Sequence, residues 1–174
     1  MNGAIKYTIV LTLFLMFLVS CNDTGKTKRR RYVSQETLMN VNKKLVNRDM
    51  DEIKRYVDSL GINAKITQTG LWYSISKRGE GPNVQKSQII TLKYKVLLLD
   101  GTVCYNSDSD GLKVFEVGHG GVESGLEEGV LMLNKGSKAV FILPPYLAHG
   151  LLGDDNKIPA RSSIVYDVEV LSIE

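Results

Sequence analysis

Between Gly70 and Glu174 the chain consists of short strand-like runs separated by turn signals, and this pattern restricts the fold more than any other feature of the sequence. The last run, Ser162–Ile173, alternates apolar and polar side chains, which is typical of a strand with one buried face. Asp100-Gly101 lies between two extended runs and therefore predicts a β-hairpin. Strands are predicted over residues 71–76, 88–99, 102–105, 113–117, 139–143 and 162–173.

Residues 122–133 differ from these runs, because their apolar side chains recur at helical spacing. The side chains that would share one helix face are Val122, Leu126, Val130 and Leu133. The chain has 174 residues, of which 43% are hydrophobic and 24% charged, so it suits one ordinary globular domain and excludes a wholly disordered chain. We therefore predict an α+β domain over residues 70–174, in which an antiparallel sheet wraps around a short helix.

The N-terminus carries a feature that is unrelated to this domain. Tyr7–Val19 is an uncharged apolar run of about 13 residues, short of the roughly 20 needed to cross a bilayer, and it fits a secretory signal peptide. Leu18-Val19-Ser20-Cys21 resembles the bacterial lipobox, in which cleavage before the cysteine leaves a lipidated residue. We therefore predict a lipoprotein signal peptide over residues 1–20 and a chain anchored in the cell envelope through Cys21. A retained N-terminal anchor helix is the alternative.

Charge is distributed unevenly along the chain. Residues 1–69 hold 12 Lys+Arg and 6 Asp+Glu, whereas residues 70–174 hold 10 and 13. Many of the basic residues fall in the polar tether over residues 21–33, which is either a solvated spacer or a contact for anionic lipid headgroups. The export signal and the acidic domain give no support to a nucleic-acid partner.

Residues 34–61 form an amphipathic helical pattern, with apolar residues mainly three and four positions apart. The pattern is interrupted near residues 47–49, so that two shorter helices are possible, and Gly61 ends it. Its apolar stripe must pack either on the following domain or on a second copy of the chain. A dimer through residues 34–60 is therefore one of two interpretations.

Several short motifs in the domain, each weak alone, follow one another in a specific order. They are Asp100-Gly101-Thr102, Gly125-Leu126-Glu127-Glu128-Gly129, Gly136-Ser137-Lys138-Ala139, Pro144-Pro145, Leu147-Ala148-His149-Gly150, Ile158-Pro159 and Val165-Tyr166-Asp167-Val168-Glu169. From residue 88 to 174 this order resembles the FKBP-type peptidyl-prolyl isomerases. The layout of the whole chain resembles the lipid-anchored FKBP-type proteins of Bacteroidetes envelopes, including those associated with gliding motility. The resemblance implies a sheet curled around a short helix, with a shallow apolar pocket between them.

The resemblance also implies an activity, the cis-trans isomerisation of X–Pro bonds in polypeptides. Rotation about this amide passes through a state without C–N resonance, and the uncatalysed barrier is about 18–20 kcal/mol. Because no bond breaks, the reaction requires no nucleophile, metal or cofactor. An apolar pocket accelerates it by stabilising the twisted amide better than the planar one.

The family's pocket positions correspond to both retained and altered residues here. Tyr94 retains the strand aromatic, His149 replaces the tyrosine that donates a hydrogen bond to the peptide, and Tyr166 replaces the last-strand phenylalanine. These three are the catalytic candidates that the resemblance implies. Histidine titrates near neutral pH, so that His149 would add pH sensitivity.

The remaining positions are substrate-binding candidates. Cys104-Tyr105 replaces the family's Phe-Asp pair, and Val122-Glu123 replaces its Val-Ile pair. Leu126 stands where a tryptophan usually forms the pocket floor, and the apolar Ile158 is retained in the late loop. Cys104 is interpreted as a small buried hydrophobe rather than a redox thiol.

These replacements leave two functions open. The first is a lipid-anchored peptidyl-prolyl isomerase that assists the folding of envelope or exported proteins. The second is a catalytically weak FKBP-like binding module or chaperone in an envelope assembly such as the gliding machinery. The intact scaffold favours the enzyme, and the altered pocket favours the binding module. We expect no metal site and no cofactor in either case.

Overall fold

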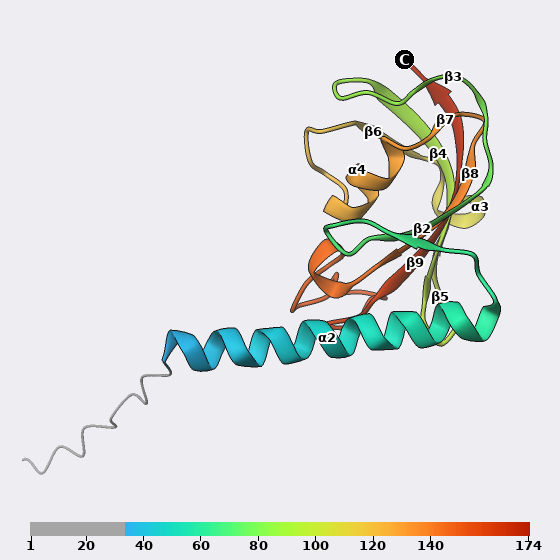
Figure 1. Cartoon of the computed structure of the whole chain (residues 1–174). Coiled ribbons are helices and arrows are strands. Elements are labelled where there is room, and N and C mark those ends of the chain that lie inside the picture. Colours follow the sequence, from blue (N-terminus) through green and yellow to red (C-terminus); the bar gives the residue numbers. More distant parts are fainter. Residues whose placement is uncertain (1–33) are drawn as a thin grey trace, which may run out of the picture. The chain divides into compact units, whose positions relative to one another are not determined.

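The two longest strands, β4 (Ile89–Leu98) and β9 (Ile164–Ile173), pair antiparallel inside a seven-stranded sheet. Its strand order is β1 (Lys65–Ile66), β2 (Trp72–Lys77), β8 (Lys138–Leu143), β9, β4, β5 (Val103–Asn106), and β6 (Lys113–Glu116) also pairs with β4. All of these pairings are antiparallel. The sheet curls around a helix, as Figure 1 shows, which confirms the predicted α+β fold.

The computed structural model describes residues 34–174. The predicted signal peptide, Cys21 and the basic tether lie outside the described residues. Within the described part of the chain, no helix is both long and apolar enough to span a membrane.

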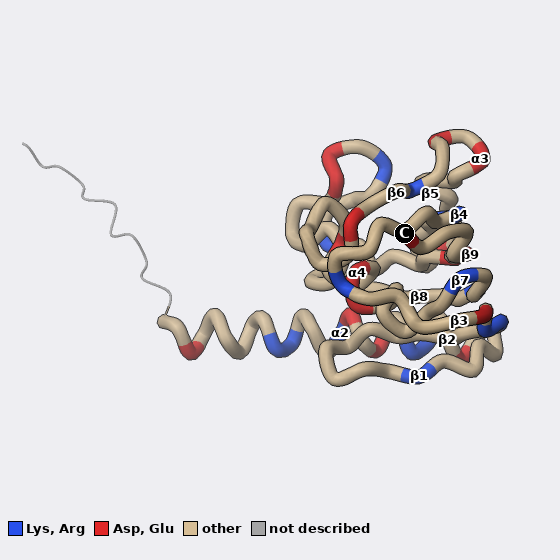
Figure 2. Tube along the Cα trace, turned by 90° about the horizontal axis from the view of Figure 1, so that it is seen from above, with Lys and Arg blue, Asp and Glu red and all other residues tan. Residues whose placement is uncertain are grey.

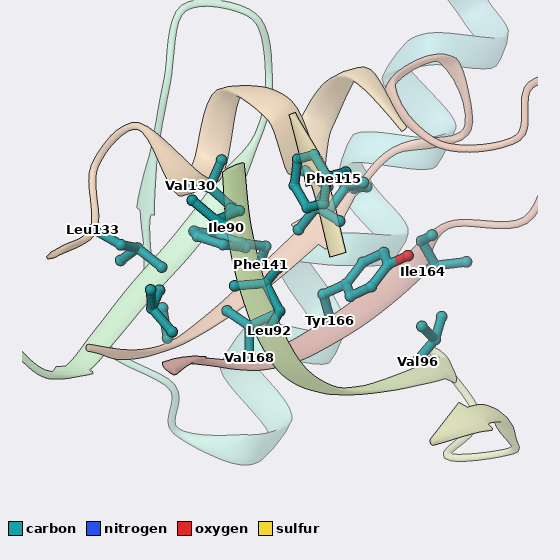
Figure 3. Close-up of a cluster of buried hydrophobic side chains, with 14 of the residues drawn as sticks. Ile90, Leu92, Val96, Phe115, Val130, Leu133, Phe141, Ile164, Tyr166 and Val168 are labelled. Carbon is teal, nitrogen blue, oxygen red and sulfur yellow. The ribbon is translucent and has the colours of Figure 1, made fainter. Parts of the chain in front are cut away.

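A short helix, α4 (Ser124–Val130), packs on the concave face of the sheet. Gly125 and Gly129 allow this close approach, because a Cβ atom on either would lie less than 3 Å from Leu143 or Phe141 of β8. Inward-facing side chains of β4, β6, β8 and β9 complete the core against α4. Figure 3 shows the Tyr166 ring among these apolar side chains, with its hydroxyl oxygen directed away from Leu92 and Val168.

The helix that precedes the sheet, α2 (Gln35–Leu60), is continuous, so the interruption predicted near residues 47–49 is absent. Ile53 and Val57 of α2 pack on Ile142 and Val165, which alternate with the inward-facing residues and therefore lie on the outer face of the sheet. The second half of α2 thus packs on its own domain. Its first half carries the exposed apolar residues Leu38, Met39 and Val41 and extends beyond the sheet (Figures 1 and 2).

The smaller elements depend on local hydrogen bonds. The helix α3 (Ser107–Asp110) begins after Asn106, whose side chain accepts a hydrogen bond from the Asp108 N–H. The 3-10 helix η1 (Pro145–Leu147) follows β8 and leads into the loop of residues 148–163. A separate two-stranded sheet joins β3 (Glu80–Asn83) to β7 (Asn134–Lys135).

Figure 2 shows that basic and acidic residues are interspersed over the described part of the chain.

Candidate active site

A cavity of about 230 Å³ opens between the concave face of the sheet and the start of α4. Its walls come from β4, β5, β6, β9, the residue before α4 and the loop after η1. The lining residues are Tyr94, Val96, Tyr105, Lys113, Glu123, His149, Asp154 and Tyr166. The structure therefore brings together five of the nine residues that the sequence singled out.

The sheet register places two tyrosine rings in this cavity. Val96 of β4 is opposite Tyr166 of β9, and Tyr94 lies on the same face as Val96 because strand side chains alternate. The Tyr94 and Tyr166 ring centroids are 6.2 Å apart, with an angle of 42° between the ring planes. Such tilted pairs are favourable aromatic contacts, so the two rings stabilise each other and form one apolar wall of the cavity.

The lining of the cavity also contains a buried carboxylate. The Glu123 side chain is 8% exposed, and the Tyr166 hydroxyl, on a residue 1% exposed, lies 2.9 Å and 3.0 Å from its two oxygens. His149 Nε2 lies 2.8 Å from Glu123 Oε1. Burial and the nearby negative charge of Glu123 raise the pKa of Tyr166, so its hydroxyl stays protonated and donates to Glu123. A pocket expected to be apolar therefore has one polar side.

Lys113 lies over both tyrosine rings and was not identified from the sequence. Its Nζ atom is 5.2 Å from the Tyr94 centroid and 5.6 Å from the Tyr166 centroid, which is cation–π distance. The alternation of β6 places Lys113 on the same face as the buried Phe115. The spacing of two residues between Lys113 and Phe115 was therefore a signal in the sequence that both side chains face the core. A lysine in a strand, however, normally indicates a solvent-exposed side chain.

The rim of the cavity is a second polar cluster, centred on Asp154. Its carboxylate accepts hydrogen bonds from the Tyr105 hydroxyl and from the backbone N–H groups of Asn156 and Ile158. Burial would raise the pKa of Asp154, but these hydrogen bonds outweigh burial and lower it. The bond to Asp154 raises the pKa of Tyr105, whose ring also lies 4.8 Å from Lys157 Nζ. Tyr105 is therefore held in place at the rim.

A second, more open cavity of about 390 Å³ continues from the first. It shares Lys113, Glu123 and His149 with the first cavity and adds Gly121, Val122 and Ala148. A polypeptide segment longer than one residue therefore has a continuous surface along the residues that precede α4. Val122, another of the predicted positions, lines this second cavity.

Three predicted positions lie in the core. Leu126 and Ile158 are buried in the hydrophobic core, and neither is among the residues that line the cavity. Cys104 is also buried, its Sγ lies 3.5 Å from the Lys157 carbonyl oxygen, and burial raises the pKa of its thiol. These properties favour a small hydrophobe over a reactive thiolate. Among residues 34–174, no group of three or more His, Cys, Asp or Glu side chains is arranged to hold a metal ion.

The fold and the cavity together define a class of protein: an antiparallel sheet curled around one short helix, with an aromatic binding pocket between them. The model of the FKBP-type peptidyl-prolyl cis-trans isomerase family matches residues 81–171. The chain belongs to this family.

Relatives and solved structures agree with this assignment. A probable FkpA isomerase of Neisseria meningitidis is 38% identical over 110 residues, and FkpA of Escherichia coli is 34% identical over 110 residues. Each match covers 63% of this chain and 40% of the relative, so the chain spans less than half the length of these relatives.

Among solved structures, AtFKBP13 has a TM-score of 0.62 at 27% identity, covering 64% of this chain and 99% of that one. The crystal structure of Escherichia coli FkpA has a TM-score of 0.63 at 26% identity, covering 97% of this chain and 82% of that one. Because this second match leaves only 3% of the chain uncovered, the similarity includes α2 as well as the sheet.

Proposed function

We propose that the chain is a peptidyl-prolyl cis-trans isomerase that acts on proline-containing polypeptides. The observation that carries the proposal is the aromatic cavity in a domain of this family, with Tyr94 and Tyr166 on one wall. A proline ring against these two rings is removed from water. The twisted amide is less dipolar than the planar one, so apolar surroundings favour it and rotation is faster. No group in this proposal forms a covalent bond to the substrate.

The predicted site residues divide into three roles in this proposal. Tyr94, Tyr166 and His149 face the reacting amide, and His149 is oriented by its contact with Glu123. Tyr105, Val122 and Glu123 contact the residues that flank the proline, because they line the rim or the adjoining cavity. Leu126, Ile158 and Cys104 support the pocket from beneath.

An isomerase assay tests this function. The purified full chain is expected to accelerate the cis-to-trans relaxation of proline tetrapeptides in proportion to its concentration. Tyr94→Ala is expected to lower kcat/KM at least tenfold, because the ring that covers the proline is lost; tenfold corresponds to about 1.4 kcal/mol. Tyr73→Ala is the matched control, because Tyr73 lies on β2 and does not line the cavity.

The same assay decides between the two functions left open above. The isomerase function would be refuted by a chain that is folded, as judged by circular dichroism, but does not accelerate the relaxation of any of several tetrapeptides that differ in the residue before proline. That result would favour a binding module that holds proline-containing segments. The buried charge of Glu123 is the observation that supports this second function, since a carboxylate reduces the apolar character of the pocket.

We propose further that the isomerase domain is carried on a lipid anchor, within a layout like that of gliding-associated lipoproteins of Bacteroidetes. In this proposal residues 1–20 are the signal peptide, 21–33 the lipidated cysteine and tether, 34–61 the helical segment and 70–174 the isomerase domain. The support is the lipobox-like sequence that ends at Cys21. Acyl chains would hold the protein in the cell envelope, facing away from the cytoplasm.

Cys21→Ser is expected to move the protein from the membrane fraction to the soluble fraction, because the acceptor of the lipid is lost. Fractionation followed by immunoblotting measures the distribution. A variant that stays in the membrane fraction would support the retained anchor helix instead.

A dimer through residues 34–60 is also proposed. Its support is the row of exposed apolar residues on the first half of α2, namely Leu38, Met39 and Val41. A second copy that covered them would remove this apolar surface from water. Sedimentation of the full chain in detergent tests the proposal, and a monomer at micromolar concentration would contradict it.

A further inference from the structure

The helix α2 is attached to the segment that forms one wall of the cavity. Asp49 is only 3% exposed, although it belongs to a polar stretch of the helix. Its Oδ2 atom lies 2.5 Å from Nη2 of Arg161, in the loop before β9. Arg48 also approaches Asp49, at 3.6 Å, but the Arg48 side chain is largely exposed and its attraction is screened by water. Arg161 is therefore the main partner of the buried carboxylate.

This ion pair by itself is expected to add little to the stability of the fold. The Asp49 carboxylate loses its hydration and the Arg161 side chain, which is 23% exposed, loses much of its own, so that a well-packed apolar pair often stabilises a protein equally well. In addition, Arg161 has a φ angle of +56°, which is uncommon for a residue with a side chain, and its buried Nε has no hydrogen-bond partner. Backbone strain of this kind persists where the surrounding contacts determine the conformation. Asp49 supplies such a contact.

The strained residue is connected to the cavity through the backbone. The Arg161 N–H donates to the Gly150 carbonyl oxygen at 3.0 Å, and Gly150 directly follows His149. The Gly150 N–H donates in turn to the Pro145 carbonyl oxygen at 2.7 Å. A short path of contacts therefore runs from Asp49 through Arg161 and Gly150 to His149.

A second attachment lies on the other side of His149. The Tyr146 hydroxyl donates to the Thr69 carbonyl oxygen at 3.0 Å and lies 3.9 Å from the sulfur of Met50, the residue after Asp49. Residues on both sides of His149 are thus connected to neighbouring positions of α2: Tyr146 directly to Met50, and Gly150 through Arg161 to Asp49. Residues 49 and 50 lie outside the segment that the family model matches.

We propose that Asp49 is a positioning residue of the site: through Arg161 and Gly150 it holds His149 in contact with Glu123. In its effect on catalysis the proposal rests on the proposed isomerase function. The helix α2 then serves the chemistry of the pocket as well as the outer face of the sheet. The position of His149 is a property of the free protein, so it is measurable without any substrate.

Nuclear magnetic resonance of the full chain in detergent tests the proposal. The chain has only two histidines, so His119→Gln assigns both imidazole signals. Asp49→Asn keeps the shape of the side chain and removes its charge. We expect it to shift the His149 signal, to leave the His119 signal unchanged and to lower kcat/KM about three- to tenfold. The matched control is Asp51→Asn, the same change at an exposed position of the same helix.

The outcomes separate positioning from mere stability. If Asp49→Asn lowers the unfolding temperature but leaves the His149 signal and kcat/KM per folded molecule unchanged, the proposal is overturned. If Asp49→Asn does not fold, Arg161→Lys decides, because it keeps a positive charge but removes the guanidinium group that contacts Asp49 Oδ2; an unmoved His149 signal then overturns the proposal. An inactive wild-type chain would refute the isomerase function, whereas the His149 signal would still report the positioning.

Discussion

Tyr166→Phe is expected to lower the free energy of unfolding by about 1–3 kcal/mol, although it removes a single oxygen atom. The hydroxyl donates to the buried Glu123 carboxylate, and its loss leaves His149 as the remaining hydrogen-bond partner of that charge. The stability is lost because the buried carboxylate has one hydrogen-bond partner fewer. The ring makes no difference, because Phe retains it. Urea unfolding of the two proteins at neutral pH measures the difference.

The double variant Glu123→Ile/Tyr166→Phe is the decisive comparison. It removes both polar groups together, so no buried charge is left without its hydroxyl partner, and most of the stability lost in Tyr166→Phe is expected to return. A double-mutant cycle with Glu123→Ile should give a coupling of about 1–3 kcal/mol. A loss in the double variant equal to the sum of the two single losses would mean that the contact contributes nothing.

The same double variant is expected to be the slower isomerase, by about three- to tenfold in kcat/KM. Without the Glu123 carboxylate, His149 loses the contact that orients it towards the reacting amide. The tetrapeptide assay described above measures this change. A double variant that folds and is faster than the wild type would mean that the contact with Glu123 does not position His149, and that the polar character of the wall limits the rate.

Gly79→Ala is expected to lower the free energy of unfolding by about 3 kcal/mol or more. A Cβ atom at this position would lie 1.9 Å from the Lys135 carbonyl oxygen and 2.7 Å from the Ser137 nitrogen. These are backbone atoms, so no side chain can rotate away. If the backbone at residue 79 moved away from Lys135 to avoid this collision, the hydrogen bonds from the Gly79 N–H to Asn134 Oδ1 and Ser137 Oγ would also break. Thermal unfolding followed by circular dichroism measures the loss.

Gly81→Ala provides the matched control two residues further along the chain. Gly81 has a φ angle of +78°, so alanine is strained there, but no atom lies within 4 Å of its Cβ position. Its cost is therefore limited to backbone strain of about 1 kcal/mol. If the two variants lost equal stability, collision with Lys135 would not be the cause of the Gly79 effect.

The elements that the sequence predicted best are those whose signal is local. The turn at Asp100-Gly101 joins β4 to β5, and the Asp100 carboxylate accepts the Thr102 N–H at 2.8 Å, as suits a tight turn. The alternation over 162–173 gave β9 with its inner face buried. The small sheet of β3 and β7 was missed, because both strands are short, β3 contains glycine and proline, and the two pair over a long separation in sequence.

The candidate site was less predictable, because its chemistry depends on contacts between distant residues. The family resemblance placed Tyr94, Glu123, His149 and Tyr166 near one another, yet the hydrogen bonds that join the last three require the folded sheet. Asp49 illustrates the limit most clearly. In the sequence it appears as a break in a helical pattern, and its partner Arg161 is 112 positions away.

The position of β9 has a consequence for how the protein is made. This strand lies between β8 and β4, so the two halves of the sheet have no shared edge until residues 164–173 are present. Pairings between segments so far apart in sequence form late. A nascent chain that has not yet reached Ile173 therefore lacks the strand at the middle of its sheet. If the chain is exported, as proposed above, the order of the strands delays completion of the sheet until the last residues have been made.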